Sequence, residues 1–225
     1  MSTQASESIV LRTYPYKEAD LIVSFFTRDQ GKLRGIARRA KKPSSRFGSG
    51  LERLAYVRMQ YFHQENRDLA SLDSCELLGD SMSLSIDYDR SVAGDFLAEA
   101  AEQLLPMAEP NERFFRLMRA VSGFLADAPT PAAVWPAVTY FCLWAVKLEG
   151  FLPPMALSDE DRAIAEEMLS KPIADLAPAD WSIDWASGLR RSLIGLIEEH
   201  TERRLITVKY LEGLGVEGTS EPRLI

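Results

Sequence analysis

In the first 80 residues, short segments rich in isoleucine, valine, leucine and phenylalanine are separated by tight polar turns. Alternation with a period of two is typical of β-strands that bury one face. The turn at residues 28–31 ends on a glycine, which can adopt a positive φ. Five short strands joined by hairpins favour a small closed barrel of the OB type. The expected strands cover residues 8–14, 20–27, 32–40, 54–63 and 69–78.

From about residue 83 the hydrophobic period lengthens to that of an α-helix. Asn111 and Ser158 are placed to cap two of these helices through their side-chain oxygens. The segment that begins at Pro131 is apolar nearly all round, which indicates a central buried helix. The expected helices cover residues 91–105, 111–125, 131–148, 158–169, 186–200 and 201–211.

This change of period predicts an α+β protein of two domains. An N-terminal OB-fold β-barrel in residues 1–80 precedes an all-α helical domain in residues 81–225, and a mobile tail is expected from about residue 213. A hydrophobic content of 46% is sufficient for real cores. No apolar run approaches the roughly 18 residues that span a bilayer, and the first residues lack a signal-peptide pattern. We therefore expect a cytoplasmic protein with no membrane partner.

The sequence shows no constellation of residues that would support the common enzyme chemistries. The two cysteines, Cys75 and Cys142, are far apart, which excludes a disulfide framework and a four-cysteine zinc site. The two histidines, His63 and His200, belong to different predicted domains, so a histidine-based triad is not expected. Neither a phosphate-binding loop nor a nucleophile elbow is present. The prediction is a protein that is not an enzyme, with no catalytic residues, no cofactor and no metal.

Two acidic clusters leave one catalytic alternative open. Asp87 with Asp89, or the acidic run at residues 159–161, could hold Mg²⁺ as nuclease carboxylates do. The same residues suit the first turns of helices, where carboxylates cap backbone N–H groups and interact with the helix dipole. Helix capping is the simpler interpretation of both clusters.

The net charge of −7 conceals a strong asymmetry. Residues 1–60 carry 12 Lys and Arg against 5 Asp and Glu, whereas residues 61–225 carry 14 against 28. Screening limits electrostatic attraction to about 8–10 Å, so a polyanion responds to the local field of the barrel. Ten cations lie between residues 28 and 58: Arg28, Lys32, Arg34, Arg38, Arg39, Lys41, Lys42, Arg46, Arg53 and Arg58.

Cations and aromatic residues interleave in this segment. Arg58 and Phe62 are expected on one face of a strand, and Phe47 and Tyr61 lie close to them in sequence. Phosphate neutralisation together with stacking of bases on aromatic rings is how proteins bind single strands without reading their sequence. The alternative is that the cations solvate a small barrel and that the aromatic residues form its core.

A resemblance to a known family rests on an ordered set of motifs. The chain has Tyr-Lys-Glu-Ala-Asp at 16–20, Thr27, Gly-Lys at 31–32, and Ser-Arg-Phe-Gly at 45–48 followed by Leu-Glu at 51–52. Weaker similarity continues through Leu-Glu-Gly-Phe-Leu-Pro at 148–153 and Arg-Arg-Leu at 203–205. In this order the motifs resemble those of the bacterial RecO family.

The resemblance implies an OB-fold barrel followed by a helical domain, and a role in DNA repair and recombination through the RecF pathway. RecO-like proteins bind single- and double-stranded DNA, anneal complementary strands and work with RecR. They also contact the C-terminal tail of single-strand-binding protein while helping RecA to load. Such a protein would act in the cytoplasm, at the nucleoid, without catalysing a bond-breaking reaction.

The chain departs from the family pattern in one segment. Many members carry a four-cysteine zinc module soon after the Gly-Phe-x-Pro element, but residues 155–169 here contain no cysteine. The expectation is that the zinc module is absent. Packing of Ile164, Met168 and Leu169 would then have to hold this segment together.

The resemblance also carries over candidate site residues. Arg113, Arg116 and Arg119, spaced at three residues on a predicted helix, are candidates for binding the acidic tail of single-strand-binding protein. A contrasting hypothesis is an adaptor whose basic barrel docks an acidic protein partner instead of DNA. The nucleic-acid-binding candidates are Lys32, Arg34, Arg38, Arg39, Lys41, Lys42, Arg46 and Arg58.

Overall fold

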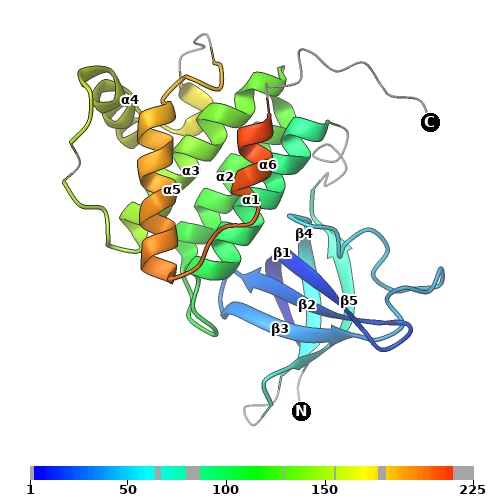
Figure 1. Ribbon diagram of the computed structural model, residues 1–225. Helices are drawn as coiled ribbons and strands as arrows, with labels where there is room; N and C mark the ends of the chain where they lie inside the picture. Colours follow the sequence, from blue (N-terminus) through cyan, green and yellow to red (C-terminus); the bar gives the residue numbers. More distant parts are fainter. Residues whose placement is uncertain are drawn as a thin grey trace, which may run out of the picture.

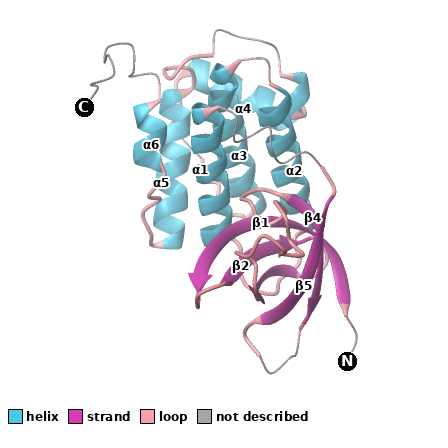
Figure 2. Cartoon of the chain, turned by 90° about the vertical axis from the view of Figure 1, so that its right-hand side faces the viewer, coloured by secondary structure: helices cyan, strands magenta, loops and turns pink. Residues whose placement is uncertain are grey.

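A β-barrel and a bundle of α-helices pack against each other in the computed structural model of the chain (Figures 1 and 2). The helices form a bundle, and the barrel lies below one end of this bundle. The structure describes residues 3–63, 67–79, 87–128, 130–154, 156–176 and 181–214.

The barrel is closed by five strands in the order β1-β2-β3-β5-β4. All pairs are antiparallel except β3 with β5, and β1 pairs with β4 to complete the closure. These strands confirm the predicted OB-like barrel and lie close to the predicted segments. Their bounds are β1 Gln4–Tyr16, β2 Asp20–Thr27, β3 Gly31–Ala37, β4 Tyr56–Phe62 and β5 Ala70–Leu77.

The helical region begins with a capped helix, as expected. The Asp87 carboxylate accepts a hydrogen bond from the Asp89 backbone N–H at 2.8 Å, and Asn111 and Ser158 cap α2 and α4 in the same way. Thr130 precedes a short 3₁₀ turn that begins at Pro131 and continues into α3. The helices are α1 Tyr88–Leu104, α2 Glu112–Asp127, η2 Pro131–Ala133, α3 Val134–Leu148, α4 Asp159–Ser170, η3 Ile173–Asp175, α5 Ser187–Thr201 and α6 Val208–Gly213.

Helix α3 is the centre of the bundle, as its apolar sequence predicts. It packs against α2, α5, α1 and α4. Contrary to the expectation that no apolar run approaches the length of a membrane span, the 18-residue stretch Pro131–Leu148 is long and apolar enough to cross a membrane, but 72% of it is buried inside the protein. Burial by neighbouring helices accounts for its hydrophobicity.

The described part of the chain has two hydrophobic cores, and some residues of the barrel belong to the core of the helices. The interior of the barrel forms its own cluster, which includes Val10, Phe25 and Tyr61. Residues on the outer side of the barrel belong instead to the core of the helices, and the Phe26 ring lies 6.1 Å from Phe114 and 5.7 Å from Phe115. Barrel residues in the helical core are Ile9, Leu11, Phe26 and Leu54.

Apolar packing holds helix α4, in the segment where a zinc module is expected to be absent. Met168 is 1% exposed, and Ile164 and Leu169 pack against the same core, as expected. The indole N–H of Trp144 donates to the Met168 carbonyl at 3.0 Å, which fixes α4 to α3. Of the expected mobile tail, residues 215–225 lie outside the described residues, whereas Leu214 is buried.

Gly31 is a close contact point between the barrel and the α1–α2 connection. Its φ is +75°, and a Cβ atom there would overlap the backbone of Glu109. The Ala108 N–H donates to the Lys32 carbonyl at 2.9 Å beside it. Both the backbone conformation and the space therefore require glycine.

We predict that Gly31→Ala destabilises the protein more than Gly48→Ala does. Gly48 also has a positive φ, but a Cβ atom there meets nothing within 4 Å. The Gly48 variant should lose about 1–2 kcal/mol of unfolding free energy from strain alone. The Gly31 variant should lose more, because the Glu109 backbone must move. Urea unfolding of both variants measures the difference, and equal losses would contradict the close packing at Gly31.

Candidate nucleic-acid interface

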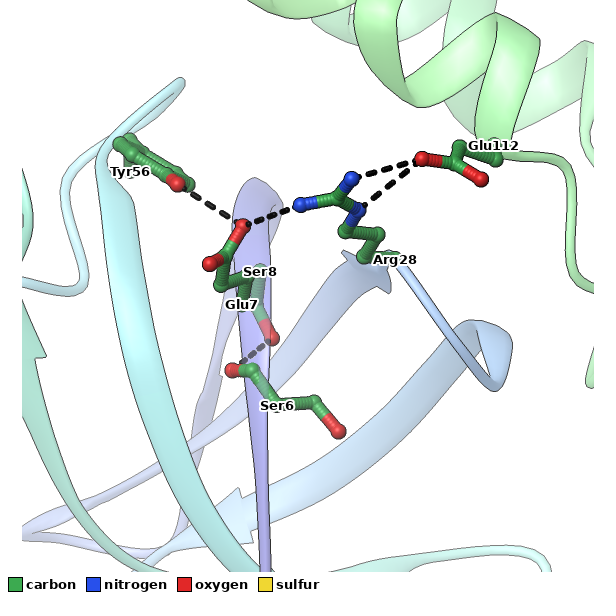
Figure 3. Close-up of polar contacts among 6 residues, drawn as sticks. All are labelled: Ser6, Glu7, Ser8, Arg28, Tyr56 and Glu112. Atoms are coloured by element: carbon green, nitrogen blue, oxygen red, sulfur yellow. Dashed lines mark hydrogen bonds and ion pairs between the residues drawn. The ribbon is translucent and has the colours of Figure 1, made fainter.

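A polar network fastens the barrel to α2 (Figure 3). The Arg28 guanidinium donates to the Glu112 carboxylate at 2.7 Å and to Glu7 at 3.3 Å, and the Tyr56 hydroxyl donates to Glu7 at 2.9 Å. The Glu112 pKa is lowered by its hydrogen bond and charge interaction with Arg28. The Arg119 guanidinium lies 3.5 Å from the centroid of the Tyr56 ring. These cations serve the junction between the two parts.

Glu102, near the end of α1, takes up two of the predicted DNA-binding cations. Its carboxylate accepts from the Ser24 hydroxyl at 2.5 Å and from Arg34 at 3.1 Å, and its backbone carbonyl accepts from the Lys32 ammonium. Lys32 is 6% exposed, and burial lowers its pKa. Lys32 is therefore not available as a phosphate contact here, contrary to its place among the candidates. Arg34 is half-exposed at the rim of the junction.

Four other candidates lie at the opposite end of the barrel, beyond β3. Arg38, Arg39, Lys41 and Lys42 are all exposed, and none of them has an ion-pair partner within the described ranges. Figure 1 places the β1–β2 hairpin at this end, away from the helices.

Backbone contacts tie these cations to the hairpin. The Arg39 N–H donates to the Asp20 carboxylate at 2.8 Å, and the Lys41 N–H donates to the Ala19 carbonyl at 3.1 Å. Arg39 itself has a positive φ of 57°. The loop that carries the cations is therefore anchored at its start, and the cations project from a defined edge.

The remaining two candidates are exposed and paired. Arg46 contacts the Asp73 carboxylate at 2.9 Å, and Arg58 contacts Glu76 at 3.7 Å. Both acids lie on β5, so the cations cross to a neighbouring element. Exposed pairs of this kind are weak, and a phosphate could compete with the carboxylate for the arginine.

The candidate aromatic residues are placed differently from one another. Tyr61 is fully buried inside the barrel, where its ring packs against Phe25, and Phe47 is 5% exposed. Neither can reach a base in this structure. Phe62 is half-buried and belongs to neither core. Alternation along β4 placed Phe62 outside, but the same pattern could not distinguish a barrel interior from a ligand-binding face.

The three candidate arginines on α2 also separate. Arg113 and Arg116 are exposed, and no ion pair involves them within the described part of the chain. Arg119 is half-buried against Tyr56, and burial lowers its pKa. Spacing of three placed these residues on neighbouring turns, but it did not reveal that the barrel covers the third.

A cleft of about 670 Å³ lies between the barrel and α1. Arg12 and Arg53 line it from the barrel side, and Arg53 forms an ion pair with Asp95 of α1. Glu99, deeper in the cleft, accepts backbone N–H bonds from Ile206 at 3.0 Å and from Thr207 at 2.8 Å, which holds the start of α6. Segments from three distant parts of the sequence form this cleft, so no local motif could have predicted it.

Arg12 and Tyr14 on β1 were not among the sequence candidates. The Arg12 guanidinium lies 5.1 Å from the centroid of the Tyr14 ring, on the side of the barrel that carries Arg34. Their spacing of two residues on a predicted strand could have indicated that they share one face. The candidates were instead taken from the segment after residue 28, where the cations are concentrated. Within the described ranges, no group of three or more histidine, cysteine or acidic residues could hold a metal ion.

Comparison with known proteins indicates the family of the chain. Residues 1–80 match the family model described as recombination protein O N terminal. A DNA repair protein RecO from Koribacter versatilis is 41% identical over an alignment of 243 residues. The alignment covers 93% of this chain and 98% of the relative. The chain belongs to the RecO family. RecO proteins from Syntrophus aciditrophicus and a Nocardioides species are 28% and 35% identical, over 68% and 65% of this chain and 58% and 59% of their own lengths. The predicted family and its OB-fold N-terminal domain are thus confirmed, and this RecO-family protein is a DNA repair protein.

We predict that the buried Glu102 stabilises the junction more than the exposed Glu112 does. Glu102→Gln should lower the unfolding free energy by about 1–3 kcal/mol, because it weakens a charge-assisted hydrogen bond at a buried site. Glu112→Gln should leave the urea midpoint nearly unchanged, since water screens its contact with Arg28. A larger loss in the Glu112 variant would mean that the network of Figure 3, rather than Glu102, secures the barrel.

Proposed function

We propose that this protein is a non-catalytic recombination mediator that binds single- and double-stranded DNA through its barrel. It anneals complementary strands and, with RecR, helps RecA to load on DNA coated with single-strand-binding protein. The finding that supports this most is the edge formed by Arg38, Arg39, Lys41 and Lys42, whose exposed side chains form no ion pair within the described residues. Several phosphates can be neutralised there without displacing an existing ion pair.

An annealing role suits this kind of surface. Binding through phosphates holds a backbone without reading its sequence and leaves the base edges available to a second strand. The helices lie on the other side of the barrel and do not cover this edge (Figure 1). A second strand could therefore approach a strand that is already bound.

The partner contacts belong to the same proposal. Arg113 and Arg116 on α2 remain candidates for the acidic tail of single-strand-binding protein, whereas Arg119 is committed to Tyr56. A peptide with acidic and apolar residues would pair its carboxylates with these exposed cations. Acting with RecR and RecA on chromosomal DNA would place the protein in the cytoplasm, at the nucleoid.

Replacing Arg38 and Arg39 together by alanine should weaken binding to every DNA sequence. Fluorescence anisotropy with a labelled strand of about 30 nucleotides, titrated at roughly 50 and 200 mM salt, measures both affinity and its salt dependence. We expect at least about tenfold weaker binding at the lower salt concentration, and a log–log slope smaller by about 1–2. Annealing of a complementary strand should slow in parallel.

Arg162→Ala with Arg191→Ala provides a matched control. Both arginines are exposed, but they lie on α4 and α5, far from the barrel edge. This variant loses the same net charge and should bind and anneal as the unmodified protein does. Equal weakening in both double variants would indicate that net charge alone governs binding, and unchanged annealing by the Arg38 and Arg39 variant would refute the site.

A further inference from the structure

A row of side chains runs across all five strands on the outer face of the barrel. Strand register pairs Tyr14 with Ile22, Ile22 with Ile36, Ile36 with Ser71, and Ser71 with Phe62. Directly opposed residues in a sheet share one face. The neighbouring residues Val23, Ala37, Tyr61 and Leu72 are buried in the interior, so this outer row, Tyr14-Ile22-Ile36-Ser71-Phe62, faces away from it.

The outer row is apolar but belongs to neither core. Its four large side chains are each half-buried, and none of them packs against the barrel interior or the helical core. The helices cover the same face only farther along the strands, at Ile9 and Phe26. Ser71, between Ile36 and Phe62 in the row, is small and exposed. Because the barrel is closed, the result is an apolar strip that winds around its outer surface from Tyr14 on β1 to Phe62 on β4.

Cations border the strip on both sides. Two residues along the strands toward the helices, Arg12 on β1 and Arg34 on β3 both lie opposite Ser24 on β2. On the other side, Arg38 follows directly after β3, and the Lys17 ammonium lies 5.3 Å from the centroid of the Tyr16 ring.

The acids close to the strip are mostly engaged. Glu102 contacts Ser24 and Arg34, Asp20 accepts from the Arg39 N–H, and Asp73 pairs with Arg46. Glu18 in the hairpin turn is exposed. The ion pairs of Glu102 and Asp73 leave Arg12, Lys17 and Arg38 without a salt bridge within the described residues, so these three cations can attract a phosphate backbone.

We propose that the outer row is a stacking surface for the bases of a single strand, with Tyr14 and Phe62 as its two aromatic contacts. This rests on the proposed DNA-binding function and adds the feature that distinguishes single strands from duplexes. Unstacked bases present their faces to aromatic rings, whereas the bases of a duplex are already stacked on each other. Phosphate contacts at Arg38 and Arg39 are open to both forms of DNA, but stacking on the strip is open only to single strands.

The experiment compares binding of a single strand of about 30 nucleotides with binding of the corresponding duplex at one salt concentration. Tyr14→Ala and Phe62→Ala should each weaken single-strand binding by about tenfold and duplex binding by less than about threefold, because stacking contributes to the first complex only. Tyr14→Phe keeps the ring and should bind as the unmodified protein does. Tyr88→Ala, which removes an exposed aromatic residue on α1, serves as the matched control.

The outcomes separate the stacking surface from the proposed function. If the alanine variants bind both DNA forms as well as the unmodified protein does, while the Arg38 and Arg39 variant loses both, the stacking surface is wrong and DNA binding by the barrel stands. Equal loss of both forms in the alanine variants also overturns stacking. No binding of either form by the unmodified protein overturns the proposed function itself.

A crosslinking measurement does not depend on the variants. A single strand substituted with 5-iododeoxyuridine, which crosslinks to aromatic rings in contact with it, is irradiated in complex with the unmodified protein. Peptide mass spectrometry should locate the crosslinks at Tyr14 or Phe62. Crosslinks confined to aromatic residues of the helices, such as Tyr88 or Tyr210, would contradict the proposal.

Discussion

The packing of the barrel's outer face against the helices determines which residues of the barrel are covered and which stay exposed. Ile9, Leu11, Phe26 and Leu54 belong to the barrel region but are buried in the helical core. Burying them fixes which part of the barrel surface is covered. Glu102 and Gly31 hold the same contact through a buried carboxylate and a close backbone approach. The end of the barrel that carries Arg38 and Arg39 stays exposed because the helices pack against the other end.

The contact between the barrel and the helices divides the cations of the N-terminal region into a group with partners at the junction and a group that is exposed. Arg28, Lys32 and Arg34 have partners at the junction, so much of their charge is compensated within the protein. The exposed group beyond β3 has no such compensation within the described ranges. Total charge therefore says little about binding, and an acidic protein can present a basic edge.

Local physics made much of this predictable from the sequence. Strand and helix periods and the caps at Asn111 and Ser158 are decided within a few residues, and the structure confirms them. The burial of Lys32 and Tyr61 could not be read in the same way. Alternation places a side chain on one face of a strand, but what covers that face depends on barrel closure and on helix α1, about 70 residues away in sequence from Lys32. The candidate DNA-binding residues could therefore be assigned to a segment of the sequence, but the sequence did not show which of them are exposed.

Hydrogen–deuterium exchange with and without a bound single strand tests the central claim most directly, because it compares every segment of the unmodified protein at once. We expect slower exchange in the β1–β2 hairpin and in residues 36–46, with α4 and α5 unchanged. Slower exchange confined to the helices, with the open end of the barrel unaffected, would contradict it.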